Sequence, residues 1–449
     1  MSQRKPPEAV DRSRRSRWIA AHVAVTVILV WPALYNGFPV LFFDTGGYLQ
    51  SGLNQVLPVG RSVIYGAFLR LLSPSALGFW PVIVVQGLVM TWVLGLVLRA
   101  RRLGHAAWLL AMGLGLGLVT ALPWYTAQMM PDWLAPAAVL ALWLLFAAPS
   151  TLGPLARAGL VMLVAAAIAS HMGSALLIVG LILVGALLYG FRQAGLAMVG
   201  LLLGLLLLPL GNWLAVGTAR PPKAEAVFLL GRMMQDGLAG RYLDMVCPDP
   251  GLRLCAVKDD LPPTANDFLW GPPGGKGTAE SLGGILALND EAWRIVLGSL
   301  QQDPWGNLRA AIANTADQMA QFDTGDGTVA EIWHSRWRIG LQYPDLVPAM
   351  EASRQMGAGI DFAFWNGLHR PVGVASLVML AGLLLWRTLR GIGPDARMLG
   401  FMLVALLGNA AICGVLSNPH DRYMSRMIWL ASFAVVLVEA GRWRTARAE

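Results

Sequence analysis

Ionisable side chains stand at the ends of long apolar stretches at four places in the chain. Asp44 follows the first stretch, Asp132 opens a later one, and His171 separates two others. The fourth place is the segment 418–426, which contains Arg422 directly before the last apolar stretch. A carboxylate can take up a proton as a general base, and the planar guanidinium of arginine matches phosphate oxygens. Because ionisable groups are costly in or beside a bilayer, each of these residues is a candidate functional residue.

Each candidate also has a purely structural explanation. Asp44 precedes Thr-Gly-Gly, a pattern typical of an aspartate that caps a turn or a short helix. Asp132 follows a proline, where the helix dipole favours an acidic residue in the first turn. His171 is also typical of a satisfied polar residue at a helix junction, and Arg422 and Arg426 are typical of interfacial anchors. Arginine is depleted in external flanks of membrane spans, however, and this favours a functional role for the arginine pair.

The composition favours a membrane as the environment of these residues. Of 449 residues, 56% are hydrophobic and only 13% are charged, unlike an average soluble domain. Apolar stretches of about 17–25 residues, the length that crosses a bilayer, recur through most of the chain. We expect ten spans, at residues 18–37, 79–98, 106–122, 132–148, 156–170, 173–190, 194–215, 371–388, 396–416 and 426–441. The two stretches around His171 could instead form one long kinked helix, which would reduce the count to nine.

The distribution of arginine predicts the orientation. Six basic residues lie in the first 17 positions, and the loops after every second stretch are basic as well. Because cytoplasmic flanks are rich in Lys and Arg, we expect both termini on the cytoplasmic side of a bacterial plasma (inner) membrane. These arginines account for the formal net charge of +8 and face anionic membrane lipids, so no nucleic-acid partner is expected. The first stretch lacks a small-residue cleavage site and is interpreted as a retained helix.

The predicted fold is an all-α polytopic membrane protein of about ten transmembrane helices with a large, mostly helical external loop domain. Residues 1–217 are expected to form a transmembrane region of about seven helices, with a first external loop at 38–78. The apolar stretches stop at 218–370, which we expect to be a periplasmic domain. They resume at 371–449, where about three more helices are expected.

Amphipathic segments are expected on the external side. Apolar and polar residues alternate at helical spacing in 225–243, 291–300 and 307–322, the last with Leu308, Ile312, Met319 and Phe322 as its apolar residues. Residues 68–72 place apolar side chains around an arginine and predict a short helix that rests on the membrane interface.

The sequence contains three cysteines. Cys247 and Cys255 enclose a short loop inside the external domain, where an oxidising compartment favours a disulfide over free thiols. Cys413 lies in an apolar stretch and is interpreted as a small packing residue. No histidine pair accompanies these cysteines, so a zinc site is not expected.

All four candidate segments fall on the external face under this topology. Such one-sidedness is uncommon for polar residues scattered by chance among helix ends. The economical interpretation is a water-exposed cavity beneath the large external loop.

Four features occur together in this chain. They are an aspartate after the first span (Asp44), a Pro-Asp pair that opens a later span (Asp132), an external histidine (His171) and an Arg-Tyr pair before a C-terminal span (Arg422 and Tyr423). With the large external loop, this set resembles the integral membrane glycosyltransferases of the GT-C superfamily. The resemblance implies that the first-loop acidic residue is a catalytic base or metal-site residue. It also implies that external basic residues hold the phosphate of a lipid-linked sugar donor.

The resemblance implies roles for individual residues. Asp44 takes the proton of the acceptor hydroxyl, and Arg422 holds the departing phosphate of a polyprenyl-phosphate-linked sugar donor. Further substrate-binding residues are expected at Tyr48, Gln128, Asp132, His171, His420 and Tyr423. The acceptor is expected to be an envelope lipid, glycan or protein. The superfamily often carries paired acidic residues in this loop, whereas Asp44 stands alone, so a divalent cation as cofactor is left open.

Other functions are weighed against this one. A transporter or channel would place charged residues at mid-span and pair broken helices, whereas the spans here are nearly uncharged. A phosphoethanolamine or acyl transferase would need a nucleophile or a metal cluster in the external domain, where His334 and His369 are the only histidines. Another lipid-linked envelope-modifying enzyme and a non-catalytic membrane scaffold stay open as alternatives.

Overall fold

The computed structural model describes residues 7–53, 57, 63–73, 76–171, 173–219, 223–271 and 275–446. Within these residues every regular element is a helix, and the one β-type contact is an isolated bridge between Val40 and Gln128. The all-α class is therefore confirmed for this part of the chain. The part of the basic N-terminal tail that precedes Pro7 lies outside the described residues.

The helices follow one another through short connections. The first half of the chain contains α1 (Pro7–Asn36), α2 (Thr45–Leu53), α3 (Val63–Leu71), α4 (Trp80–Ala100), α5 (Ala106–Val119), α6 (Leu122–Thr126), η1 (Pro131–Trp133), α7 (Leu134–Ala147), η2 (Pro149–Thr151), α8 (Pro154–Ser170), α9 (Gly173–Tyr189), η3 (Phe191–Gln193) and α10 (Ala194–Val216). The second half contains α11 (Glu225–Gln235), α12 (Leu238–Val246), η4 (Arg253–Asp260), α13 (Ala265–Trp270), α14 (Thr278–Ser281), α15 (Ile285–Gln302), α16 (Pro304–Ala320), α17 (Trp333–Gln342), η5 (Pro344–Leu346), α18 (Val347–Glu351), α19 (Phe362–Leu389), α20 (Pro394–Leu416) and α21 (Asp421–Ala446).

Among the described residues, six helices are long and apolar enough to cross a membrane. They are α1, α4, α10 together with η3, α19, α20 and α21. Four shorter apolar helices accompany them, namely α5, α7 together with η1, α8 and α9. An α-helix rises about 1.5 Å per residue, so about 20 residues cross the apolar core of a bilayer. The helices thus support a membrane protein, while the count of ten spans stays a prediction.

Small residues let these apolar helices pack closely. Gly200 and Gly204 lie one turn apart on α10, which packs against α8. A Cβ atom at position 204 would lie 2.7 Å from the Cβ atom of Ile168, so only glycine permits this approach. Small interface residues are the usual means by which membrane helices associate, because they allow the backbones to come together.

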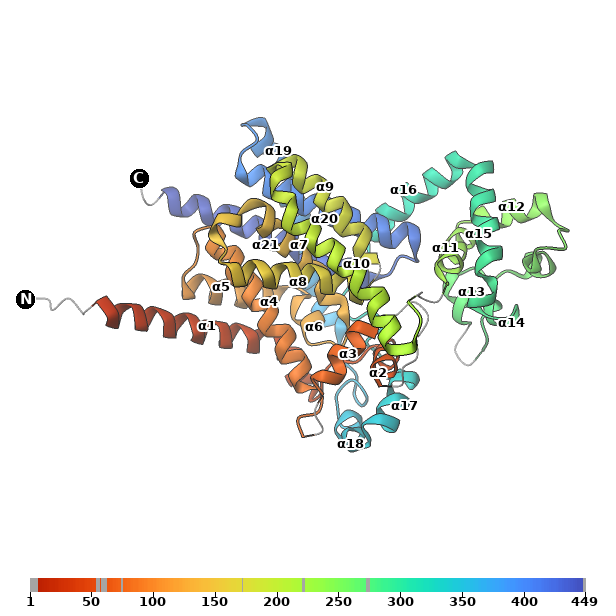
Figure 1. The fold of residues 1–449 in the computed structure, drawn as a ribbon, viewed down its shortest axis with the longest axis horizontal. Helices are drawn as coiled ribbons and strands as arrows, with labels where there is room; N and C mark the ends of the chain where they lie inside the picture. Colours follow the sequence, from red (N-terminus) through yellow and green to blue (C-terminus); the bar gives the residue numbers. More distant parts are fainter. Residues whose placement is uncertain are drawn as a thin grey trace, which may run out of the picture.

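Helix α21 lies at the centre of the bundle. Of its 18 most apolar consecutive residues, 78% are buried, against 17% for the same length of α19. It packs against α19 and α20 and also contacts α5, α6 and α7. Figure 1 shows both chain termini at one end of the molecule, so α21 begins at the opposite end of the bundle. Its first turns, which carry Arg422 and Arg426, therefore stand at the centre of that opposite end.

Helices α11 to α15 form a lobe at the end of the molecule that lies away from the termini (Figure 1). The lobe has an apolar core of its own, which includes Leu230, Phe268 and Ile295. A disulfide joins Cys247 and Cys255. The lobe therefore has packing of its own, and it also contacts the bundle, where Nη1 of Arg232 donates to Asn418 at 2.9 Å.

Helix α16 connects the lobe to the bundle by packing along α20. Its buried face carries Asn314 and Gln318, whereas Leu308 and Ile312 are 47% and 63% exposed. Of the apolar residues expected to pack, Met319 and Phe322 lie against the core of the bundle, whereas Leu308 and Ile312 do not. The reason is a close backbone approach, since a Cβ atom at Gly414 of α20 would lie 2.4 Å from the carbonyl oxygen of Asn314.

The segment between α16 and α19 packs against the first loop instead of against the lobe. Ile332 and Ile339 belong to the same apolar cluster as Leu41. The side chain of Gln355 accepts the backbone N–H of Leu41 at 3.0 Å and donates to its carbonyl at 2.9 Å. The stretch expected as one external domain therefore consists of two parts with different partners. Helix α19 begins at Phe362, earlier than the expected start at 371.

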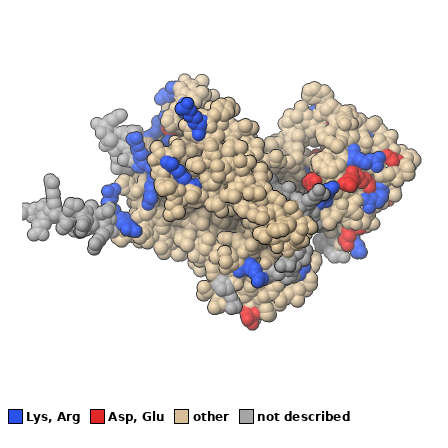
Figure 2. Space-filling model, viewed as in Figure 1, with Lys and Arg blue, Asp and Glu red and all other residues tan. Residues whose placement is uncertain are grey.

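Charged side chains gather at the two ends of the molecule. Figure 2 shows Lys and Arg near the end that carries the termini, both signs of charge on the lobe and on the lower protrusion, and a largely uncharged surface on the helix bundle between them. The short interfacial helix expected at 68–72 corresponds to the end of α3, in which Leu69 is buried and Leu71 is exposed. An uncharged belt between two charged ends is typical of a protein that crosses a bilayer.

Candidate functional site

The loop after α1 is held from two sides, and this fixes the position of Asp44. The hydroxyl of Thr45 donates to the carbonyl of Met129 at 3.2 Å. The hydroxyl of Ser335 accepts the backbone N–H of Gly46 at 2.8 Å. Asp44 therefore stands directly before α2 on a fixed backbone, with its side chain 26% exposed.

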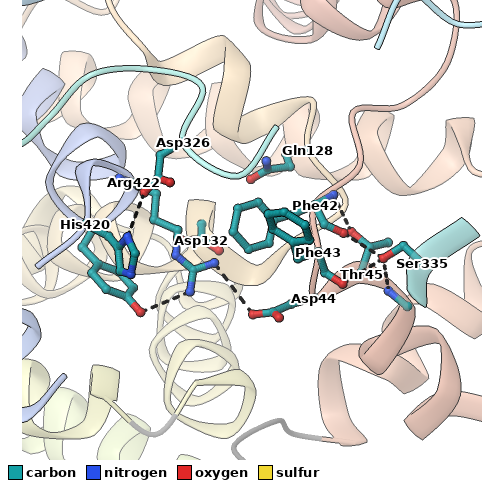
Figure 3. A network of polar contacts seen from close by, with 12 residues as sticks. Phe42, Phe43, Asp44, Thr45, Gln128, Asp132, Asp326, Ser335, His420 and Arg422 are labelled. Atoms are coloured by element: carbon teal, nitrogen blue, oxygen red, sulfur yellow. Dashed lines mark hydrogen bonds and ion pairs between the residues drawn. The ribbon is translucent and has the colours of Figure 1, made fainter. Parts of the chain in front are cut away.

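Arg422, in the first turn of α21, faces Asp44 across a narrow gap (Figure 3). Its Nη1 lies 3.8 Å from the Oδ2 of Asp44, and its Nη2 donates to the hydroxyl of Tyr423 at 3.2 Å. The Cζ of Arg422 also lies 4.4 Å from the centre of the Phe42 ring. Nη1 is buried and has no hydrogen-bond partner among the described residues. Because 3.8 Å is too long for a hydrogen bond, Arg422 retains a donor for a further acceptor.

Asp326 fixes the start of α21 and lies above Arg422 in Figure 3. Its Oδ2 accepts the backbone N–H of Arg422 at 3.2 Å and lies 3.5 Å from Nδ1 of His420. Burial opposes the ionisation of Asp326, but the hydrogen bond and charge of His420 and the contacts to Arg422 hold its pKa below the usual value. Asp326 is therefore a carboxylate at neutral pH.

Glycines on both sides of Asp326 let its loop pass close to two aromatic rings. Gly325 has a φ of +106°, and a Cβ atom there would lie 2.3 Å from Cγ of Phe362. Gly327 has a φ of +70°, and a Cβ atom there would lie 1.9 Å from Cε2 of Phe42. Side chains rarely tolerate a positive φ. The Gly-Asp-Gly sequence therefore lets the loop turn and pass close to both rings.

A second ion pair lies one helical turn further along α21. Nη1 of Arg426 donates to Oδ1 of Asp132 at 2.8 Å, and the two side chains are only 5% and 4% exposed. Nη2 of Arg426 donates to Asn409 at 3.4 Å, and its Nε has no partner within the described part of the chain. Asp132 reaches this arginine from η1, the turn that precedes α7. A buried charge needs a counter-charge, so Asp132 is committed to Arg426.

His171, at the junction of α8 and α9, is close enough to both ion pairs to interact with their charges. Burial lowers the pKa of His171 to about 4, helped by the charges of Arg426 and Arg422 and opposed by those of Asp132 and Asp44. Its Nδ1 is buried and has no hydrogen-bond partner in the described structure. The imidazole is therefore neutral at neutral pH.

These residues form one group, here termed the charge cluster. It consists of Asp44, Asp132, His171, Asp326, His420, Arg422, Tyr423 and Arg426. Six of them are site residues expected from the sequence. Of the other two expected residues, Gln128 lies at the edge, where its amide donates to the Thr328 hydroxyl at 3.3 Å. Tyr48 differs, since its ring packs 5.1 Å from that of Tyr65 in the apolar cluster of the first loop.

The sequence alone does not predict Asp326 as a site residue. It indicates Arg426 as a candidate but does not predict that Arg426 pairs with Asp132. The available signal for Asp326 is the pentapeptide Thr-Gly-Asp-Gly-Thr at 324–328. It sets a carboxylate among glycines in a polar loop, much as Gly46 follows Asp44. The partner of Arg426 has no such signal, because Asp132 and Arg426 are 294 residues apart.

A divalent cation does not fit the donor set of the charge cluster. Among the described residues, no three His, Cys, Asp or Glu side chains are grouped as ligands of one ion. Asp326 and His420 form only a pair, and Asp44 and Asp132 each face an arginine. Arginines thus occupy the positions where a cation would balance the carboxylates.

No family model, no curated protein and no solved structure matches the chain. The charge cluster itself has three features that bear on function. They are a partly exposed carboxylate, a facing arginine with an unused donor, and a buried ion pair behind both.

Proposed function

We propose that this protein is an integral membrane glycosyltransferase of the GT-C type. In this proposal it moves a sugar from a polyprenyl-phosphate donor to an envelope lipid, glycan or protein on the external face of the membrane. The observation that carries the proposal is the buried Nη1 of Arg422, which lacks a hydrogen-bond partner among the described residues and lies 3.8 Å from the Asp44 carboxylate. An arginine with an unused donor suits a phosphate, and a carboxylate beside it suits proton transfer from a hydroxyl.

The proposed topology has ten spans and places both termini in the cytoplasm. Six long and four shorter apolar helices support this count among the described residues. The basic loops and the termini then share the cytoplasmic side of a plasma membrane, in line with the preference of such flanks for arginine. The charge cluster and the lobe face the outside, and the polyprenyl chain reaches the cluster sideways from the bilayer.

The proposed reaction is a displacement at the anomeric carbon of the donor sugar. The acceptor oxygen forms a bond to this carbon while the bond from the carbon to the phosphate oxygen breaks. Asp44 takes the proton of the acceptor hydroxyl. The polyprenyl phosphate leaves with the bonding electron pair, and Arg422 neutralises the charge that builds up on it. The bond formed and the bond broken balance, so the step needs no other reactant.

Burial separates the roles of the two aspartates in this reaction. Asp132 is 4% exposed and bound to Arg426, so it cannot accept a proton from a substrate without breaking a buried ion pair. Asp44 is 26% exposed, and its distance to Arg422 is longer than a hydrogen bond. We therefore assign proton transfer to Asp44 and the positioning of Arg426 to Asp132.

The substitution Asp44→Asn tests the proposal. The amide keeps the shape of the side chain but cannot accept a proton, so transfer is expected to fall by about 100- to 10,000-fold. Mass spectrometry of the cell envelope, at equal protein level, would follow the product that carries one additional sugar. The matched control is Asp345→Asn, which changes an exposed carboxylate of the same external region and should keep full transfer. Full product from Asp44→Asn would remove the role of the base and favour a non-catalytic scaffold.

A further inference from the structure

Four arginines gather at the end of the bundle that carries the chain termini (Figure 1). Arg387 and Arg390 stand at the end of α19, and Arg442 stands near the end of α21. Their guanidinium carbons lie 4.8, 4.3 and 4.8 Å from the centre of the Trp386 ring, so any two lie within twice the longest of these distances. Arg101, which follows α4, shares a carboxylate with Arg387. The four side chains are here termed the arginine group.

Carboxylates neutralise only part of this charge among the described residues. Asp395, in the first turn of α20, pairs with Arg101 and, at 3.1 Å, with Arg387. Glu439 pairs with Arg442 at 2.9 Å. The four guanidiniums and the two carboxylates therefore leave a formal charge of +2. Like charges this close repel one another, so the arginine group favours a further anion.

Two members of the arginine group retain hydrogen-bond donors. Arg390 is exposed, and its guanidinium lies on the Trp386 ring without an ion pair in the described part of the chain. Arg387 is 23% exposed, and its Nε and Nη2 have no hydrogen-bond partner within the described residues, although Nη2 lies close to Asp395. Each guanidinium has five N–H donors in one plane, a shape that matches phosphate oxygens. The anion that suits this group is therefore a phosphate.

The arginine group lies at the level where lipid phosphates are expected. Residues 371–386 of α19 contain no charged side chain, and Arg387 follows them directly. Residues 427–438 of α21 are also uncharged. Arg422 and Arg442 stand near the two ends of α21, roughly 30 Å apart at about 1.5 Å per residue, which is the thickness of the apolar core of a bilayer. Trp386 is itself typical of the boundary between this core and the headgroups.

Helix α19 adds an apolar surface that leads to the arginine group. Val378, Leu385 and Leu389 are exposed, and their spacing places them on one face of the helix. An acyl chain can lie along this face while its headgroup reaches the arginines. A free phosphate ion makes no use of such a face, so the surroundings favour a lipid as the source of the phosphate.

We infer that the arginine group binds the phosphate of an anionic phospholipid whose acyl chains lie along the exposed face of α19. Contacts between arginine and phosphate are charge-assisted, and basic pockets between membrane helices suit anionic headgroups. A zwitterionic headgroup carries an ammonium beside its phosphate, which the arginines repel. The inference does not depend on the proposed function, because the charge cluster lies at the opposite end of α21.

Native mass spectrometry of the full-length protein in detergent measures the binding. The probes are phosphatidylglycerol, phosphatidylcholine, and two competitors without acyl chains, namely glycerophosphoglycerol and inorganic phosphate. Arg390→Gln removes one charge from an exposed side chain that has no ion pair among the described residues, so folding should be unaffected. The matched control is Arg192→Gln. Arg192 is an exposed arginine of η3, near Tyr189, which is close enough to Arg101 to interact with its charge.

The wild type is expected to bind phosphatidylglycerol at least about 10-fold more tightly than phosphatidylcholine. Arg390→Gln should weaken phosphatidylglycerol by about 5-fold and leave phosphatidylcholine within twofold, because one arginine near the phosphate is lost. Arg192→Gln should bind both lipids within twofold of the wild type. Equal weakening by the two variants would indicate a general effect of charge and overturn the site, as would a wild type that does not prefer the anionic lipid.

Two further measurements test the lipid as the source of the phosphate. Neither competitor should displace phosphatidylglycerol at equal concentration, and displacement by inorganic phosphate would assign the site to a free anion. Leu385→Ser should weaken phosphatidylglycerol by about 2- to 5-fold, because it removes apolar surface from the face of α19. Its control is Leu202→Ser, which changes an equally exposed leucine of α10 and should keep the affinity. Unchanged binding in Leu385→Ser overturns the position of the acyl chains.

Discussion

The ion pair between Arg294 and Asp249 in the lobe of α11 to α15 is exposed, whereas the pair between Arg426 and Asp132 in the charge cluster is buried. A second pair of the lobe, between Arg232 and Asp236, is also largely buried, and it lies where the lobe meets Asn418 of the bundle. In the lobe, Arg294 pairs with Asp249 at 3.0 Å, and the side chains are 56% and 31% exposed. In the cluster, Arg426 pairs with Asp132 at 2.8 Å, and both side chains are buried. Exposed pairs contribute little to stability, whereas buried ions lose their hydration and are costly to maintain. Packing alone does not require such ions at the centre of an apolar bundle, so we attribute them to function.

Removing one partner of the buried pair is the strongest way to test this comparison. Asp132→Ala leaves Arg426 buried without its counter-charge, so the free energy of unfolding should fall by about 3–5 kcal/mol. Thermal unfolding of the purified protein in detergent measures the change. The double variant Asp132→Leu with Arg426→Met replaces the pair by apolar groups and should recover most of the stability without recovering transfer. A double variant as unstable as the single one would contradict the cost assigned to the buried ions.

Arg422→Ala should affect transfer more than folding. It removes one charge-assisted contact of about 2–4 kcal/mol to the leaving phosphate, which corresponds to roughly 30- to 1000-fold in kcat/KM. Both kcat and KM are expected to change, because the contact to the phosphate strengthens as the bond breaks. Arg370→Ala is the control, since this arginine pairs with Asp323 and is 57% exposed. Equal activity of the two variants would remove Arg422 from the site.

His171 should make the stability of the cluster depend on pH. The pKa of His171 is about 4 in the folded protein and 6.5 in its ordinary state, so between these values the unfolded chain binds the additional proton. Stability is therefore fully present above about pH 6.5 and falls, by up to about 3 kcal/mol, as the pH decreases toward 4. Unfolding measured across this range should lose part of its pH dependence in His171→Gln. The exposed control His105→Gln should keep it, and an unchanged profile in both would refute the assignment.

The smallest effect is expected in the lobe. Arg294→Ala removes an exposed ion pair, so the free energy of unfolding should change by less than about 1 kcal/mol. Transfer should stay at the level of the wild type, because this pair belongs to the lobe and not to the charge cluster. Thermal unfolding and the envelope assay provide the two measurements. A loss comparable to that of Asp132→Ala would abolish the contrast between the two regions.

The apolar helices were predictable because their signal is local. A stretch of about 20 apolar residues is readable without knowledge of any partner, and the helices lie close to the expected stretches. Candidate site residues were also predictable as types, because ionisable groups at the ends of apolar helices are rare and therefore conspicuous. Asp44 and Arg422 face each other although 378 positions separate them in the sequence, and their positions at the starts of α2 and α21 place them at one end of the bundle.

Features that depend on partners were not predictable. The pairing of Asp132 with Arg426 and the role of Asp326 follow from tertiary packing, which no local pattern encodes. The packed face of α16 was not predictable for the same reason. A glycine on α20 lets the backbone and polar side chains of α16 approach, and Leu308 and Ile312 stay exposed. Tyr48 was expected near the substrate because of its sequence neighbours, yet its ring turns to Tyr65.

The hydrogen bonds between Leu41 and Gln355 have a consequence for biosynthesis. They join residues that are 314 positions apart. At about 5–20 residues per second, a ribosome needs roughly 15–60 s to make the intervening chain. During this interval the first loop has left the ribosome, while the side chain that holds its backbone does not yet exist. The carboxylate of Asp44 therefore waits on a loop that lacks the hydrogen bonds of Gln355 to Leu41, and a nascent chain arrested before Gln355 contains every residue of the first loop but cannot complete its anchoring.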